Sequence, residues 1–228
     1  MKNKNHFFTF NRIILSAVLV ILTAFSAQAQ RPVMNDWSIA DFFKNLPESY
    51  ITVEGDFAKP SAENIVFDEK NGYAAVYMNS PEPGSGDEAF PTFQMALFKS
   101  QTKLPLIVIA NMKSDHVCTD YETFFLRYDD RTWTEVGREV LPTLNLKMFW
   151  DKPQSAGRLL KIIKESATSY HFEPPRRGTR MKVSLEICDF LEDDTPQNKA
   201  DELSKLIKTA KPIYLDWDKQ NGKFKFTK

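Results

Sequence analysis

Cysteine, histidine and glycine are scarce in this chain of 228 residues, which contains two, three and eight of them respectively. The sequence also lacks the GxGxxG dinucleotide fingerprint, the phosphate loop, the HExxH metal helix and the GxSxG nucleophile turn. Two separated cysteines and so few histidines do not supply the four ligands of a structural zinc site. We therefore expect neither a bound metal nor a cofactor.

Net charge is absent as well, because 30 basic residues balance 30 acidic ones. A neutral chain has no general electrostatic attraction for nucleic acid or for anionic lipid. Beyond residue 25, no stretch approaches the eighteen or so apolar residues that a transmembrane helix requires. We expect no nucleic-acid partner and no membrane span in the main part of the chain.

The amino-terminal residues have the pattern of an export signal. Lys2, Lys4 and Arg12 precede an apolar run at residues 13–25, and a small-x-small site ends at Ala29. We expect residues 1–29 to be a signal peptide, with an uncleaved anchor as the alternative. Removing its three basic residues leaves 27 basic against 30 acidic residues, a formal charge of −3. The expected location is the periplasm or the extracellular space.

Residues 104–136 are the most apolar and β-branched part of the remaining chain. The continuous apolar run at residues 106–109 predicts a strand that is covered on both faces. From Tyr121 the side chains alternate, which predicts a second strand, and residues 129–131 form a short polar turn before a third. We predict a three-stranded antiparallel meander.

The other elements are read from caps, turns and spacing. Ser38 and Asp41 form a capping box that opens a helix ending before Pro47. Strands are predicted at residues 64–68, 73–79, 90–100, 170–173, 181–190, 213–218 and 223–227, and helices at 156–167 and 196–210. The fold class is α+β with antiparallel sheets and a few packed amphipathic helices. The arrangement is either two lobes, at residues 30–150 and 151–228, or one split sheet.

One loop concentrates reactive side chains, namely Asp115, His116 and Cys118. A His116–Cys118 nucleophilic dyad is one interpretation, but sequence neighbours rarely point at a common atom. We favour a polar turn. A disulfide between Cys118 and Cys188 would close a loop of about 70 residues and stabilise the fold by roughly 4 kcal/mol. Whether it forms depends on geometry that the sequence does not contain.

Two further groups are candidates for binding. The loop that carries Arg176, Arg177 and Arg180 has the charge to hold a phosphate or an acidic sugar, although a solvated loop explains it more simply. Trp133 belongs to a set of four tryptophans that either line a groove or fill the core; the others are Trp37, Trp150 and Trp217.

The segment DFFKNLP at residues 41–47 and the meander at 106–136 resemble a family of secreted Bacteroidota proteins that contain a domain of unknown function. Members open with a signal peptide and a DFF-type helix, and have a strand of the type seen here at residues 124–133. Their turn often has two nearby cysteines, whereas this chain has only Cys118. The resemblance implies an α+β envelope protein and supplies no catalytic residue.

These observations predict an exported, non-catalytic envelope protein that binds a protein, peptide or glycan. The first alternative is a hydrolase of glycan or peptide that uses Asp115, His116 or Cys118. The second is a protein inhibitor or surface-interaction module, for which two lobes around a concave sheet are suited.

Overall fold

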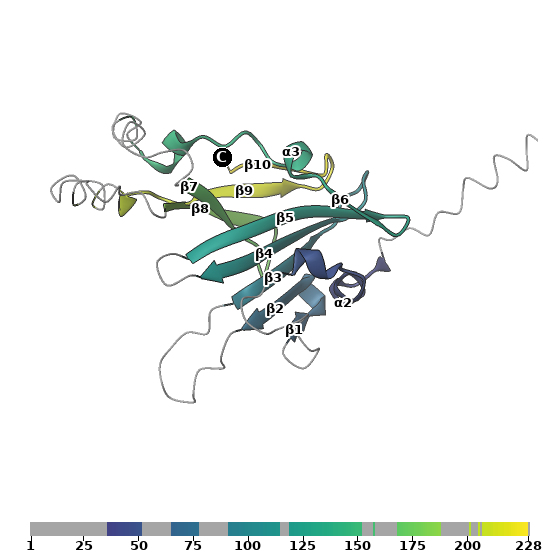
Figure 1. The fold of residues 1–228 in the computed structure, drawn as a ribbon. Coiled ribbons are helices and arrows are strands. Elements are labelled where there is room, and N and C mark those ends of the chain that lie inside the picture. Colours follow the sequence, from purple (N-terminus) through teal and green to yellow (C-terminus); the bar gives the residue numbers. More distant parts are fainter. Residues whose placement is uncertain are drawn as a thin grey trace, which may run out of the picture. The chain divides into compact units, whose positions relative to one another are not determined.

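Antiparallel strands dominate the computed structural model (Figure 1). It describes residues 36–51, 65–77, 91–114, 119–151, 157, 168–187, 201, 205 and 207–227. The predicted signal peptide lies outside these ranges. The chain separates into Met1–Asp36 and Trp37–Lys228, and the elements below belong to the second unit.

The first sheet has six strands that follow one another in sequence order. They are β1 (Ile65–Asp68), β2 (Tyr73–Tyr77), β3 (Pro91–Phe98), β4 (Leu106–Ser114), β5 (Thr119–Asp129) and β6 (Thr132–Glu135). All neighbouring pairs are antiparallel. The predicted meander is confirmed as β4–β6, and the strands expected before it are confirmed as β1–β3.

Two tight connections in this sheet use a left-handed backbone. Between β1 and β2, a 3₁₀ turn (Glu69–Asn71) ends at Gly72, where φ is 63°. Between β5 and β6, Asp130 and Arg131 have φ values of 44° and 64°. Positive φ at both central residues produces a turn whose twist matches that of the flanking strands. The first hairpin was predicted from strands at residues 64–68 and 73–79 and the second from its polar turn at 129–131, and both are confirmed.

The second sheet has four strands in the order β10-β9-β8-β7. They are β7 (Thr168–Glu173), β8 (Arg180–Ile187), β9 (Ile213–Asp218) and β10 (Lys223–Phe226). The predicted strands are confirmed, except that residues 188–190 lie outside the described ranges. Each sheet falls within one of the two predicted lobes, and the boundary between residues 150 and 151 stays a prediction.

Helices are short in the described part of the chain. Helix α2 (Ile39–Lys44) has the predicted capping box, in which Ser38 and Asp41 bond reciprocally, and it buries Phe42 and Phe43. The others are α3 (Gly137–Val140), η2 (Glu48–Tyr50) and η5 (Leu146–Phe149). Most residues of the predicted helices 156–167 and 196–210 lie outside the described ranges.

The described residues are therefore mainly β, which confirms antiparallel sheets and supports the α+β class only loosely. In these ranges, no helix has both the length and the apolar character that crossing a membrane requires.

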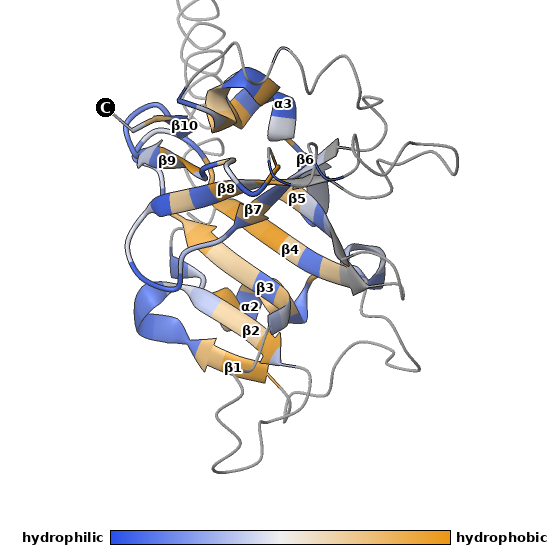
Figure 2. Cartoon of the chain, turned by 90° about the vertical axis from the view of Figure 1, so that its left-hand side faces the viewer, coloured by the Kyte–Doolittle hydropathy of each residue, from blue (hydrophilic) through white to orange (hydrophobic). Residues whose placement is uncertain are grey.

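One hydrophobic core joins the two sheets. Phe125 on β5 contacts Phe172 on β7 and Phe224 on β10, with ring centroids 5.2 and 6.4 Å apart. Trp150 and Trp217 belong to the same core and are each 6% exposed. Figure 2 shows hydrophobic colours along β1, β3 and β4 of the first sheet. The other face of that sheet packs against α2, whose Phe43 meets Phe93 edge to face.

Candidate functional site

A cavity of about 600 Å³ lies where the polar face of β7 and β8 meets the first sheet. Its size is typical of sites that enclose a small ligand or a segment of a larger one. The lining residues come from five strands and one loop; they are Tyr73, Tyr77, Pro91, Gln94, Tyr121, His171, Glu173, Pro174, Pro175, Arg176, Lys182 and Ser184. We call this cavity the tyrosine pocket.

The wall from the first sheet is formed by side chains of β2, β3 and β5, namely Tyr73, Tyr77, Pro91, Gln94 and Tyr121. Residues paired across strands share a face of the sheet, and the register places Tyr73, Gln94 and Tyr121 on the same face. The Tyr73 hydroxyl donates to Oε1 of Gln94 at 3.2 Å.

The opposite wall comes from the second sheet, where polar side chains alternate with core residues. His171 pairs with Ser184 across β7 and β8, and Glu173 pairs with Lys182. The Lys182 ammonium donates to Oε2 of Glu173 at 2.8 Å. The imidazole of His171 stacks on the ring of Tyr121, with centroids 3.4 Å apart and planes inclined by 11°. That stack joins β7 to β5.

The loop between β7 and β8 closes one end of the pocket. Pro174 is buried there, and the guanidinium of Arg176 donates to Oδ2 of Asp68 at 3.2 Å. Asp68 also accepts from the side-chain amide and the backbone of Asn71. These bonds, with that to Asn71 foremost, hold the pKa of the Asp68 carboxyl below its usual value. The loop is thus attached to the turn that joins β1 and β2.

Burial keeps His171 and Tyr73 of the pocket neutral. Loss of solvent lowers the pKa of His171 to about 4, so its ring is uncharged at neutral pH. Burial likewise raises the pKa of Tyr73, which remains a hydroxyl donor. Nε2 of His171 and Oγ1 of Thr123 are buried without a hydrogen-bond partner among the described residues. The pocket therefore offers planar rings and uncharged polar atoms, while its charged side chains form pairs.

The residues predicted to be reactive, Asp115, His116, Cys118 and Cys188, all lie outside the described residues. The backbone of β4 ends at Ser114, which pairs with Thr119 at the start of β5. Neither the nucleophilic dyad nor the Cys118–Cys188 disulfide is tested by this structure, and both stay predictions.

Among the predicted binding residues, Trp133 serves the scaffold. Its indole N–H donates to the carbonyl of Asn45 at 2.9 Å, at the end of α2. Its ring also contacts Tyr128, with centroids 4.9 Å apart. Trp133 thereby connects the edge strand β6 to helix α2.

The predicted arginine cluster is divided between two partners. Arg176 pairs with Asp68 of β1, whereas Arg180 donates to Oδ1 of Asp216 on β9 at 2.9 Å. Arg177 is exposed on the loop between them. Of the three, only Arg176 lines the tyrosine pocket.

Sequence reasoning did not single out Tyr73, Gln94, Tyr121 or His171 as site residues. They lie on four strands of two sheets, so no spacing along the chain brings them together. Alternation did assign Thr123 and Phe125 to the face opposite Phe124, and that face is the one that lines the pocket. Among the described residues, no three His, Cys, Asp or Glu side chains gather as metal ligands.

Comparison with known proteins assigns no family. No family model matches the chain, and no curated protein matches it. A solved structure, described as a domain of an uncharacterized protein from Porphyromonas gingivalis W83, aligns with a TM-score of 0.42 and 11% identity. The alignment covers 59% of this chain and 65% of that one, so the chain matches about two thirds of that domain's length.

Proposed function

We propose that the protein is an exported, non-catalytic binding protein that holds a neutral glycan segment in the tyrosine pocket. The observation that carries this proposal is the union of stacked rings and uncharged polar atoms in one cavity of about 600 Å³. Export rests on the signal-peptide pattern of residues 1–29.

Sugar rings present apolar C–H faces and a rim of hydroxyl groups. Tyr77 and Tyr121 provide flat surfaces for the C–H faces, and the phenol oxygens of the pocket, including that of the buried Tyr73, face the rim. The amide of Gln94 and the uncharged imidazole of His171 add donors and acceptors whose charge does not change near neutral pH. Few polar groups placed among rings are characteristic of sites that orient a small ligand.

The charge pattern favours an uncharged ligand over a charged peptide. Both ion pairs in the pocket wall, Lys182–Glu173 and Arg176–Asp68, are formed within the protein. A charged ligand would have to break one of them, and a neutral ligand would not. Binding of an uncharged peptide is the competing outcome.

Hydrolysis of the bound ligand is a second candidate, because register places Ser184 opposite His171. A serine nucleophile needs a base that a third group orients. The nearby carboxylate of Glu173 is paired with Lys182 instead, which favours binding without turnover.

Calorimetric titration of the purified chain with neutral di- and trisaccharides tests the proposal. We expect saturable binding that Tyr121→Ala weakens by up to about tenfold, since loss of an aromatic contact costs about 0.5–1.5 kcal/mol. Ser184→Phe, which fills the pocket from the opposite wall, should have the same effect. Tyr214→Ala is the matched control, because Tyr214 is 43% exposed and does not line the pocket.

Four results would contradict the proposal. Equal binding by all variants would exclude the pocket, and saturable binding of uncharged tripeptides alone would replace glycan with peptide. Hydrolysis of the saccharides by the unmodified chain, lost in Ser184→Ala, would show that the protein is a hydrolase. Retention of residues 1–29 on a cytosolic protein, measured by mass spectrometry, would overturn export.

A further inference from the structure

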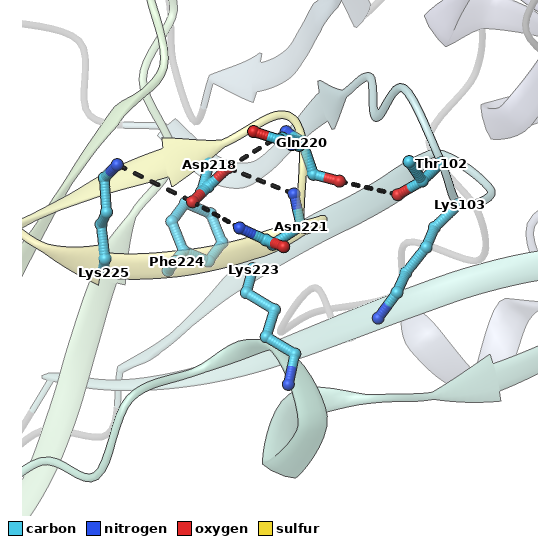
Figure 3. A pocket seen from close by; sticks show the side chains of 8 residues that line it. All are labelled: Thr102, Lys103, Asp218, Gln220, Asn221, Lys223, Phe224 and Lys225. Carbon is cyan, nitrogen blue, oxygen red and sulfur yellow. Dashed lines mark hydrogen bonds and ion pairs between the residues drawn. The ribbon is translucent and has the colours of Figure 1, made fainter.

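A second cavity, of about 620 Å³, lies at the turn between β9 and β10 (Figure 3). It is distinct from the tyrosine pocket and shares no residue with it. Its walls are the turn itself and the connection between β3 and β4; the lining residues are Thr102, Lys103, Asp218, Gln220, Asn221, Lys223, Phe224 and Lys225. We call it the lysine cleft.

Hydrogen bonds hold the two walls in a fixed relation. The hydroxyl of Thr102 donates to the carbonyl of Gln220 at 2.7 Å, and the hydroxyl of Ser100 donates to the carbonyl of Lys219 at 3.2 Å. The indole N–H of Trp217 donates to the carbonyl of Lys99 at 2.9 Å. The backbone that carries the charged side chains is therefore in place before a ligand binds, which lowers the entropy cost of binding.

Positive charge is in excess in this cleft, although the chain as a whole is neutral. Three lysines line it against one carboxylate, that of Asp218. The carboxylate accepts from the backbone N–H groups of Gln220 and Asn221 and from the Asn221 side chain. Its pKa is lowered chiefly by the bond to that side chain, so it stays ionised and serves the turn.

The lysines differ in their partners. Lys225 lies 3.8 Å from Oδ2 of Asp218. Lys103 and Lys223 are exposed, and neither has a carboxylate within ion-pair distance among the residues that the structure describes. Figure 3 shows both of these side chains extending to the same side of the turn, away from Asp218.

A half-buried arginine, Arg127, contacts the turn that forms one wall of the cleft. Nη2 of Arg127 donates to the carbonyl of Gly222 at 3.0 Å, while its Nε is buried without a partner among the described residues. Gly222 permits this convergence, because a Cβ there would lie 3.1 Å from Oγ of Ser100 and 3.2 Å from Cδ of Lys103. Fixed charges of one sign around a concave surface concentrate ions of the other sign.

We propose that the lysine cleft binds a phosphate group of a small phosphorylated ligand or of an anionic lipid headgroup. Lys103 and Lys223 contact the phosphate oxygens, and Arg127 contributes through its field. The volume exceeds that of phosphate alone, so the cleft also accommodates the group that carries it. This inference does not depend on the tyrosine pocket or on export.

The test is titration with glucose 1-phosphate and with vesicles of phosphatidylglycerol in phosphatidylcholine, at low and at high salt. We expect saturable binding of at least one probe that weakens as salt screens the lysines. The double variant Lys103→Gln/Lys223→Gln should bind about tenfold more weakly or worse. Lys103→Arg/Lys223→Arg, which keeps both charges, should retain binding within a few-fold.

The matched control is Lys147→Gln/Lys208→Gln, which removes two exposed lysines outside the cleft and changes the net charge equally. It should bind like the unmodified chain, and equal melting temperatures will show that all variants are folded. Binding of glucose 1-phosphate alone assigns a soluble ligand, and binding of vesicles alone assigns a lipid headgroup. Absence of saturable binding to both probes, or equal loss in the control, would overturn the proposal.

Discussion

His171 combines burial, aromatic stacking and an unpartnered nitrogen in one side chain. Its stack with Tyr121 holds the ring plane between β7 and β5, and Nε2 has no hydrogen-bond partner among the residues that the structure describes. Buried polar atoms of this kind usually meet water or a ligand. The same burial lowers the pKa of the imidazole.

Replacing this histidine should therefore change the pH dependence of stability. Burial, opposed by Glu173, lowers the pKa of His171 to about 4 from an ordinary value of 6.5. Between these values the unfolded chain takes up a proton that the folded chain does not, so the free energy of unfolding falls as pH drops from 6.5 to 4. Allowing for partial exposure of the ring, the loss is about 2 kcal/mol.

Urea unfolding at pH 7 and pH 4.5 measures this dependence. In His171→Gln, the fall in stability between the two pH values should be smaller than in the unmodified chain by most of that amount. Because the other ionisable groups are common to both proteins, the difference isolates His171. An unchanged difference between the two pH values would show that the ring is solvated and titrates normally.

At the scale of elements, two glycines with a left-handed backbone lie in connections of the second sheet. Gly222, with φ of 61°, lies between the last hairpin and the connection after β3. Gly178, with φ of 81°, occupies the loop after β7, where an added Cβ would meet nothing within 4 Å. The two glycines share a left-handed backbone and differ in their surroundings.

Gly178→Ala should cost about 1 kcal/mol, the strain of a left-handed alanine alone. Gly222→Ala should cost about 1–2 kcal/mol more, because the new Cβ would press on Ser100 and Lys103 in addition. Thermal unfolding of both variants measures the difference. Equal costs would mean that the connection after β3 moves aside freely.

At the scale of the whole molecule, Phe125 connects the two sheets. It is 5% exposed and lies between aromatic rings of β7 and β10. Phe125→Ala should lower the free energy of unfolding by about 3–5 kcal/mol, as large cavities in a core do. Val66→Ala, at a side chain 44% exposed on the edge strand β1, should cost less than about 0.5 kcal/mol.

The number of unfolding transitions tests whether the two sheets fold together. Because both sheets share one core, far-ultraviolet circular dichroism and tryptophan fluorescence should report a single coincident transition in urea. Separate transitions would instead show that residues 30–150 and 151–228 fold as independent lobes.

Local signals in the sequence were sufficient for most of the sheet structure. The capping box at Ser38 and the apolar run at residues 106–109 each act over a few residues, and the structure contains both. The turn at Asp130 was also anticipated, although its backbone lies in the region that glycine favours.

The candidate site was not predictable in the same way. The tyrosine pocket depends on Tyr73, Gln94 and Tyr121 facing the same side of the first sheet, and they do so only once β2–β5 are in register. His171 reaches it from a strand some fifty residues further along the chain. The loop at Asp115 was a candidate site because its reactive residues are neighbours in sequence. Proximity in sequence, however, does not show that side chains converge in space.

Bonds between the last hairpin and the connection after β3 also constrain when the protein can fold. Trp217 bonds to Lys99, and Ser100 to Lys219, across 118 and 119 residues. During synthesis, Lys99 leaves the ribosome well before Trp217 does. In that interval, the aromatic side chains of the first sheet that later pack against β9 and β10 remain exposed. Such long loops slow folding and prolong exposure to aggregation. The core that joins the two sheets is therefore complete only after β10 has been synthesised.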